Sequence, residues 1–161
     1  LDDTGKGIAA NLVAMSKKYP GAVVFLENYG MDIGAALTRG SDVWLNNPRR
    51  PKEASGTSGM KAAMNGVLNL SILDGWWPEA CQHGVNGWQF GDGFESEDET
   101  ILDNHDRAAL YRVLTEEVLP TYYDHPEKWV EMMRNSILGT KDYFGVKRML
   151  EEYNELLYKK Q

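Results

Sequence analysis

The stretch that decides the fold runs from Asp42-Val-Trp-Leu45 to Val67-Leu-Asn-Leu-Ser71. Both runs are short and apolar, which is typical of strands buried on both faces of a parallel sheet. Between them lie a polar loop rich in proline and glycine, over residues 46–56, and a helix-like segment over residues 58–65 that ends at Gly66. A strand, a crossover helix and a second strand predict two parallel neighbours in one sheet.

The same alternation continues on both sides of this stretch. Upstream we expect a helix over residues 5–18, a buried strand over residues 22–26 and a helix over residues 31–38 closed by Gly40. Downstream, residues 87–90 predict a further strand. The pattern therefore indicates an α/β fold with a doubly wound, Rossmann-like parallel sheet. Such sheets bind ligands at the carboxyl ends of their strands, so the loops after Leu26, Leu45 and Ser71 are expected at one edge.

The last third of the sequence has a different texture. Residues 92–105 are rich in Asp and Glu and are interpreted as a solvated loop, and residues from 106 onward are helical in pattern. We expect Pro120 to end a first helix, and Asp124 to cap a second that has Pro126 in its first turn. A third helix carries an apolar stripe, formed by Val146, Met149, Leu150, Tyr153, Leu156 and Leu157. This helical tail is interpreted as packing structure.

Composition excludes several classes of protein. The 161 residues include 42% hydrophobic ones, which is enough for a buried core, and 24 acidic against 17 basic residues leave a formal net charge of -7. A chain this acidic is a poor binder of nucleic acid. No apolar run reaches the ~18 residues of a membrane span. Cys81 is the one cysteine, so an internal disulfide is excluded and a reducing, cytoplasmic location is expected.

The residues with the clearest chemistry are Glu53-Ala-Ser-Gly-Thr-Ser-Gly-Met-Lys61. A loop of small residues opens here into a helix, whose first turn presents unpaired N–H groups and therefore favours an anion. We expect Lys61 in that first turn, close to a phosphate. The pattern alone is also compatible with an ordinary loop and a solvated lysine. Its spacing excludes a P-loop and a dinucleotide-binding fingerprint.

This run, continued by Ala62-Ala-Met-Asn-Gly66, closely resembles the pyridoxal-phosphate lysine motif of the glycogen (α-glucan) phosphorylase family, E-A-S-G-T-G-N-M-K. Upstream, Val24-Phe-Leu-Glu-Asn-Tyr29 resembles the family's V-I-F-L-E-N-Y segment. Two departures stand out. Ser58-Gly59 replaces Gly-Asn, and Leu73-Asp-Gly-Trp-Trp-Pro-Glu79 replaces the more common D-G-A-N-V-E. Both resemble the shorter bacterial and archaeal branch, which acts on maltodextrins or glycogen.

The resemblance implies a role for each residue of the motif. Lys61 would hold pyridoxal 5′-phosphate covalently, and Thr57, Ser58 and Gly59 would hold the cofactor phosphate. Tyr29 would pack beside the cofactor. Glu53, Ala54, Ser55 and Gly56 would bind the transferred glucose. The reaction implied is phosphorolysis, in which inorganic phosphate cleaves the terminal α-1,4 bond of a glucan and yields glucose 1-phosphate with retention. No metal is implied.

The resemblance also implies an architecture. The family has two large α/β domains of GT-B type with the active site between them, so this chain is expected to be a C-terminal part. Residues 1–91 would belong to the Rossmann-like catalytic domain, and residues 92–161 would form its acidic loop and helical tail. With the N-terminal domain absent, the chain is expected to be inactive alone and prone to self-association.

Two other functions are open. A nucleotide-sugar glucosyltransferase of the same architecture would also place a diphosphate at a helix N-terminus, but it has no need of Lys61. A non-catalytic binding or assembly module is the other alternative.

Further residues are interpreted as structural. The three histidines match no motif of the family and are expected at the surface or in packing: His83, His105 and His125. Core packing is expected for Trp44 and Trp129, whereas Trp76 and Trp77 are as well suited to stacking on a sugar as to a core. The basic residues before the motif are expected to form a solvated patch rather than a phosphate clamp: Arg49, Arg50 and Lys52.

Overall fold

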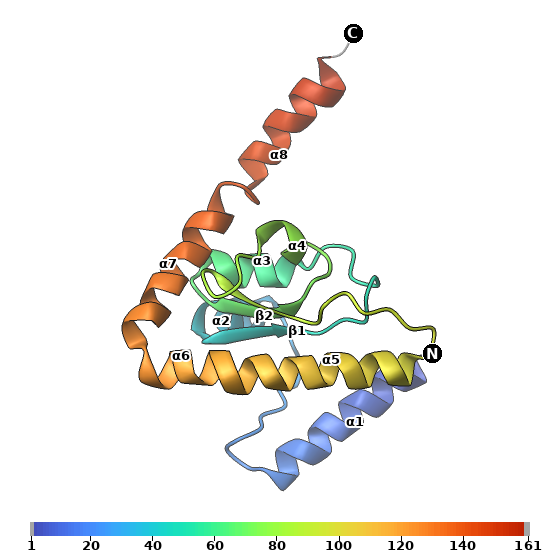
Figure 1. Ribbon diagram of the computed structural model, residues 1–161. Helices are drawn as coiled ribbons and strands as arrows, with labels where there is room; N and C mark the ends of the chain where they lie inside the picture. The colour runs from blue at the N-terminus through green and yellow to red at the C-terminus, as the bar shows by residue number, and fades with distance from the viewer. Residues whose placement is uncertain (1, 160–161) are drawn as a thin grey trace. The chain divides into compact units, whose positions relative to one another are not determined.

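The structure is a computed structural model that describes residues 2–159 (Figure 1). The chain divides into two compact units, Leu1–Gly34 and Ala35–Gln161. The helix α2, Met31–Gly40, crosses the boundary and confirms the helix expected over residues 31–38.

The first unit contains helix α1, Asp3–Lys18, close to the predicted bounds. Asp2 caps it, since its carboxylate accepts a hydrogen bond of 2.7 Å from the Gly5 N–H. The buried strand predicted over residues 22–26 is wrong: the segment has no strand structure, and Val24 is 71% exposed. A strand needs a neighbour to satisfy its backbone groups, and the described residues of this unit contain no other strand.

The second unit is built on a parallel sheet with the order β1-β2-β3. Its strands are β1, Val43–Asn46, β2, Leu68–Ile72, and β3, Gly87–Phe90. In this register Val43 lies beside Leu68, and Leu70 lies beside Trp88. The α/β class and these three predicted strands are confirmed. Because all three run in one direction, the loops that follow them open at the same edge.

The two faces of the sheet are covered by different helices, and Figure 1 shows α3 and α4 on one side and α5 on the other. Alternate residues of β2, from Leu68 to Ile72, enter a core with Trp88 and Phe90 and with residues of the C-terminal helices, Val113, Val118, Trp129 and Met132. Toward the other face lie helix α3, Thr57–Met64, and the short helix α4, Trp77–Ala80. A second cluster there contains Ala63, Trp76 and Trp77.

The helical tail begins earlier than expected. Helix α5, Glu99–Val113, includes half of the predicted acidic loop, so that loop is confined to residues 91–98. Pro120 does not end the helix: α5 continues through a π-helical stretch η1, Leu114–Val118, into α6, Leu119–Asp124. The wider turn lies directly before the proline, where the missing N–H and the ring would otherwise disrupt the i→i−4 bonds.

Two further helices complete the tail. Helix α7, Pro126–Lys141, has His125 at its N-cap position, so the cap expected at Asp124 is also wrong. Helix α8, Val146–Tyr153, passes into a second π-helical stretch η2, Asn154–Tyr158. Their predicted apolar stripe is present but exposed; Val146 and Leu157 are each 64% exposed. Among residues 2–159, no helix combines the length and the apolar character that a membrane crossing requires.

Candidate functional site

The motif from Glu53 to Lys61 lies at the carboxyl edge of the sheet, between β1 and β2. Gly56 occupies the N-cap position of α3 with a left-handed φ of +90°, and no side chain caps the helix. The Gly59 N–H donates to the Gly56 carbonyl, at 3.1 Å. The amides of Thr57 and Ser58 precede it in the first turn and have no partner among the residues described. This helix end therefore offers open donors to an anion.

The turn after β2 holds the start of this motif through two hydrogen bonds. The Glu53 N–H donates to Asp74 Oδ2 at 3.0 Å, and the Trp76 N–H donates to the Ser55 carbonyl at 2.8 Å. Gly75, with φ +58°, allows this approach, because a Cβ there would lie 2.5 Å from the Ser55 carbonyl oxygen. These contacts fix the backbone of Glu53 and Ser55, the two residues expected to bind the substrate. Glu53 is half-buried.

Gly59 is required by two buried side chains. A Cβ at this position would lie 2.7 Å from Asn69 Oδ1 and 2.9 Å from Trp76 Nε1. Asn69 also donates to the Gly59 carbonyl at 3.1 Å. The two departures from the resembled family pattern are therefore linked: with Trp76 in the turn after β2, the helix has no room for a side chain at position 59.

The aromatic residues whose role the sequence left open belong to the core. Trp76 and Trp77 are 2% and 1% exposed, and their ring centroids lie 5.2 Å apart. Phe144 meets Trp76 edge-on at 5.1 Å. Trp129, expected in the core, is buried in the other cluster. Neither Trp76 nor Trp77 presents a face on which a sugar could stack.

Lys61 lies on the exposed side of α3. It is the fifth residue of the helix, so its expected place in the first turn is corrected to the start of the second. Ala62 and Ala63 form the buried side of the helix, whereas Lys61 and Thr57 are both exposed. Four residues apart on a helix, these two share a face, with Cβ atoms about 6 Å apart. Among the residues described, Lys61 has no ion-pair partner.

This arrangement fits a phosphate-bearing aldehyde. The open amides of Thr57 and Ser58 suit the phosphate, and the unpaired amine of Lys61 lies on the same face for the aldehyde. Beneath Gly59, the buried atoms Asn69 Oδ1 and Trp76 Nε1 have no hydrogen-bond partner among the residues described. Tyr29 belongs to the first unit and is 62% exposed, so its contact with a cofactor stays a prediction.

Comparison with known proteins identifies the family of the chain. Residues 16–154 match the model of a family described as carbohydrate phosphorylase. The chain belongs to the carbohydrate phosphorylase family. It is 47% identical to maltodextrin phosphorylase of Thermococcus litoralis, with 99% of this chain and 19% of that protein aligned. It is 44% identical to glycogen phosphorylase of Aquifex aeolicus, over 99% of this chain and 23% of the relative. The chain thus spans about a fifth of these relatives.

Two cavities flank the carboxyl edge in this phosphorylase-family chain. One of about 520 Å³ lies beside Asp74 and is bordered by Arg50, Pro51, Leu73, the segment from Phe94 to Glu97, and Leu102. The other, of about 580 Å³, lies between the end of β3 and α5. His83 and His105 border it, and each contacts a carboxylate: Glu117 at 2.6 Å and Asp92 at 2.9 Å. The hydrogen bond from His105 lowers the pKa of Asp92.

The remaining reactive groups have structural surroundings. Burial raises the pKa of the Cys81 thiol to about 12, so the thiolate needed for nucleophilic chemistry is scarce at neutral pH. Within residues 2–159, no three His, Cys, Asp or Glu side chains gather as metal ligands.

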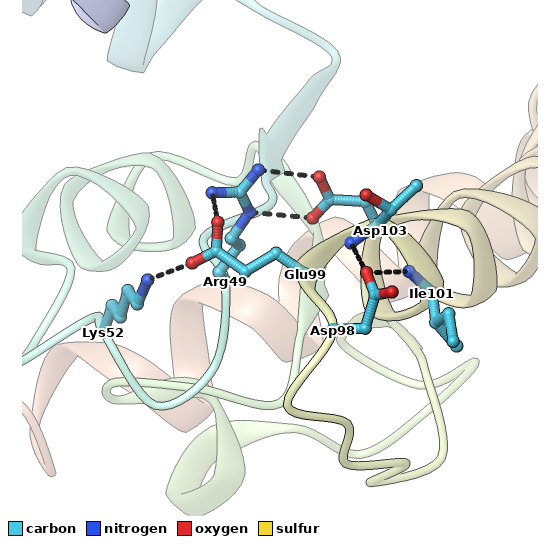
Figure 2. A network of polar contacts seen from close by, with 7 residues as sticks. Arg49, Lys52, Asp98, Glu99, Ile101 and Asp103 are labelled. Atoms are coloured by element: carbon cyan, nitrogen blue, oxygen red, sulfur yellow. Dashed lines mark hydrogen bonds and ion pairs between the residues drawn. The ribbon is translucent and has the colours of Figure 1, made fainter.

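The basic patch predicted before the motif is not simply solvated. Arg49 and Lys52 form ion pairs with Glu99 and Asp103 of α5 (Figure 2). Sequence reasoning missed these partners because they lie about fifty residues away in the chain.

Proposed function

We propose that the full-length protein is an α-glucan phosphorylase, which uses inorganic phosphate to cleave the terminal α-1,4 bond of maltodextrin or glycogen and releases glucose 1-phosphate. The relatives' names support the reaction class. The observation that carries the proposal is the helix end of α3, where two open amides and the amine of Lys61 share one exposed face.

In this proposal the amine of Lys61 holds pyridoxal 5′-phosphate through the aldehyde carbon of the cofactor. Thr57 and Ser58 hold the cofactor phosphate with their backbone amides and hydroxyls, and the positive end of the helix favours the anion. Gly59 lies beside them in the same turn, with its amide donating to the Gly56 carbonyl, and its missing side chain makes room for Trp76. When bound, the cofactor supplies a phosphate group that assists proton transfer to the glycosidic oxygen through the substrate phosphate.

The loop before the helix binds the sugar. The half-buried carboxylate of Glu53 accepts hydrogen bonds from glucose hydroxyls, and Ser55 adds a hydroxyl beside it. Ala54 and Gly56 keep side-chain bulk away, so that the backbone can approach the ring. Polar groups fixed in this way, before the reaction begins, bind the sugar without reorganisation. Tyr29 packs beside the cofactor in the assembled protein.

The same proposal covers architecture. Residues 1–91 belong to a Rossmann-like domain of a two-domain GT-B enzyme, and residues 92–161 form its acidic loop and helical tail. The other domain supplies the remaining active-site groups. A cytoplasmic location suits the free thiol of Cys81. Self-association as a homo-oligomer belongs to the proposal as well.

Borohydride reduction of the full-length holoprotein, followed by peptide mapping, tests the site. We expect the pyridoxyl label on Lys61. The Lys61→Ala variant should lose phosphorolysis of maltodextrin by at least about a hundredfold, whereas Lys141→Ala, an exposed lysine of α7, should keep it. A label on another lysine would overturn the site. Glucosyl transfer from a nucleotide sugar, with no release of glucose 1-phosphate from glucan and phosphate, would replace the proposed reaction by a synthase.

A further inference from the structure

An ion-pair cluster joins the loop after β1 to the first turns of α5 (Figure 2). Arg49 binds both oxygens of Asp103, through Nε at 2.8 Å and Nη2 at 2.7 Å. Its remaining nitrogen, Nη1, donates to Glu99 at 2.7 Å, and Lys52 donates to the other oxygen of Glu99 at 2.9 Å. Arg49 therefore uses three nitrogens on two carboxylates one helical turn apart. We call these four residues the α5 clamp.

The helix side of the α5 clamp is well fixed. Asp98 caps α5, since its carboxylate accepts hydrogen bonds from the amides of Thr100 at 2.8 Å and Ile101 at 3.4 Å (Figure 2). Helix α5 packs on β3 through the main core, to which Leu110 and Val113 contribute. Glu99 and Asp103 are thus presented from a rigid element and lie on one helix face, four residues apart.

The loop side of the α5 clamp leads directly to the proposed sugar site. Lys52 is followed by Glu53, whose N–H is held by Asp74 at 3.0 Å. The loop over residues 47–56 contains no helix or strand, and two backbone hydrogen bonds hold it, from the Lys52 N–H to the Arg49 carbonyl at 2.9 Å and from the Trp76 N–H to the Ser55 carbonyl at 2.8 Å. Side-chain contacts supply its other attachments. The α5 clamp holds the loop at Arg49 and Lys52, and the turn after β2 holds it at Glu53 and Ser55. Between these two attachments lies the backbone that orients Glu53.

The contribution of the clamp is geometric rather than stabilising. All four side chains are about half exposed, and exposed ion pairs add little to the stability of a fold. Bidentate contact between a guanidinium and a carboxylate, however, restricts direction as well as distance. A loop held this way keeps a binding residue in place, and small displacements at a reacting centre reduce rates steeply.

We propose that Arg49, held by Asp103 and Glu99, is a positioning residue that orients Glu53 and Ser55 for the transferred glucose. The inference rests on the proposed function, since it assigns the sugar to those two residues. Arg49 itself touches neither sugar nor cofactor in this scheme.

Steady-state kinetics of the full-length holoenzyme test the proposal. Arg49→Ala should lower kcat/KM for maltodextrin phosphorolysis about tenfold, with unchanged pyridoxal content. Arg49→Lys keeps the charge but not the bidentate contact and should recover only part of the loss. The charge swap Arg49→Glu with Asp103→Arg should recover part of the activity lost in Arg49→Glu alone, because Glu99 still faces the new carboxylate at position 49. Arg134→Ala, an exposed arginine of α7, serves as the matched control.

Two results would overturn the proposal. One is an Arg49→Ala enzyme with wild-type kcat/KM. The other is a charge swap no more active than Arg49→Glu alone, measured on variants whose urea midpoints show that they are folded. The proposed function fails separately, if the wild-type protein releases no glucose 1-phosphate at all.

Discussion

Gly59 belongs both to the Glu53–Lys61 motif and to the packing between α3 and the residues beneath it. A Cβ at this position would overlap Asn69, which is fully buried, and the indole of Trp76. The glycine therefore serves close packing, in a helix where an alanine would otherwise be favoured by about 1 kcal/mol. The cost of the glycine in helix propensity is offset by burial of a tryptophan under the candidate site.

Gly59→Ala should lower the free energy of unfolding by about 1–3 kcal/mol, because the new Cβ overlaps two buried side chains. Trp76→Ala should also destabilise, by about 3–5 kcal/mol, through the cavity that it leaves. The double variant should cost less than the sum, because one of the two overlaps is gone. Urea unfolding followed by far-UV circular dichroism measures all three.

The matched control for this cycle is Gly139→Ala in α7. Its Cβ would have only an ordinary contact, 3.7 Å from Asn86, so a gain of about 0.5–1 kcal/mol is expected. Strict additivity of the two substitutions at positions 59 and 76 would contradict the proposed overlap between them.

At the scale of elements, the attachment of the loop to α5 depends on ionised carboxylates. The hydrogen bond from Arg49 lowers the pKa of Asp103, and the hydrogen bond from Lys52, followed by the charge of Arg49, lowers the pKa of Glu99. A lowered pKa in the folded state means stability that is present above the ordinary range of Asp and Glu and is lost as the pH falls through the lowered values.

We therefore expect Arg49→Met to be slightly less stable than wild type at pH 7 and to become equal to it only as the pH falls below the lowered pKa values of Glu99 and Asp103. The effect is small because the groups are exposed. Urea midpoints across this pH range check the convergence. Arg134→Met should track wild type throughout, and a difference for Arg49→Met that persists at low pH would show that the ion pairs are not its source.

At the scale of the whole molecule, the tail carries apolar surface without a partner in the described chain. Along α8 and η2, apolar side chains such as Val146, Leu150 and Leu157 are about 60% exposed. An apolar stripe of this length on a helix marks an interaction surface. Since the chain spans about a fifth of its relatives, the rest of the protein is the occupant that we propose.

The isolated 161-residue chain should release no glucose 1-phosphate from maltodextrin and phosphate, and it should self-associate through the exposed stripe. Light scattering coupled to size-exclusion chromatography measures the mass. Replacing Leu150 and Leu157 by Ser should shift the chain toward the monomer, whereas Ser at the exposed Lys128 should not. Phosphorolysis by the isolated chain, or a monomeric wild-type chain, would refute this prediction.

Local sequence determined the elements whose cause is local. The strands β1, β2 and β3 follow from short apolar runs between turns, and α3 follows from a glycine-rich start and a closing glycine. The same reasoning singled out Lys61 and a helix N-terminus with open amides, because unpaired amides belong to any helix N-terminus. Residue-by-residue resemblance added the chemical roles, which spacing alone left open.

Tertiary structure decided everything that depends on a distant partner. The run over residues 22–26 is apolar enough for a strand, yet the described unit offers it no neighbour. Trp76 and Trp77 lie in the core because Phe144 and α3 cover them. Arg49 forms its ion pairs with carboxylates of α5, a distant segment of the sequence. Propensity and spacing act over a few residues, whereas burial and ion pairing depend on which segments the fold brings together. That is why the sequence alone determined the motif of this phosphorylase-family chain, and only the folded structure determined what packs beneath the motif and what holds its loop.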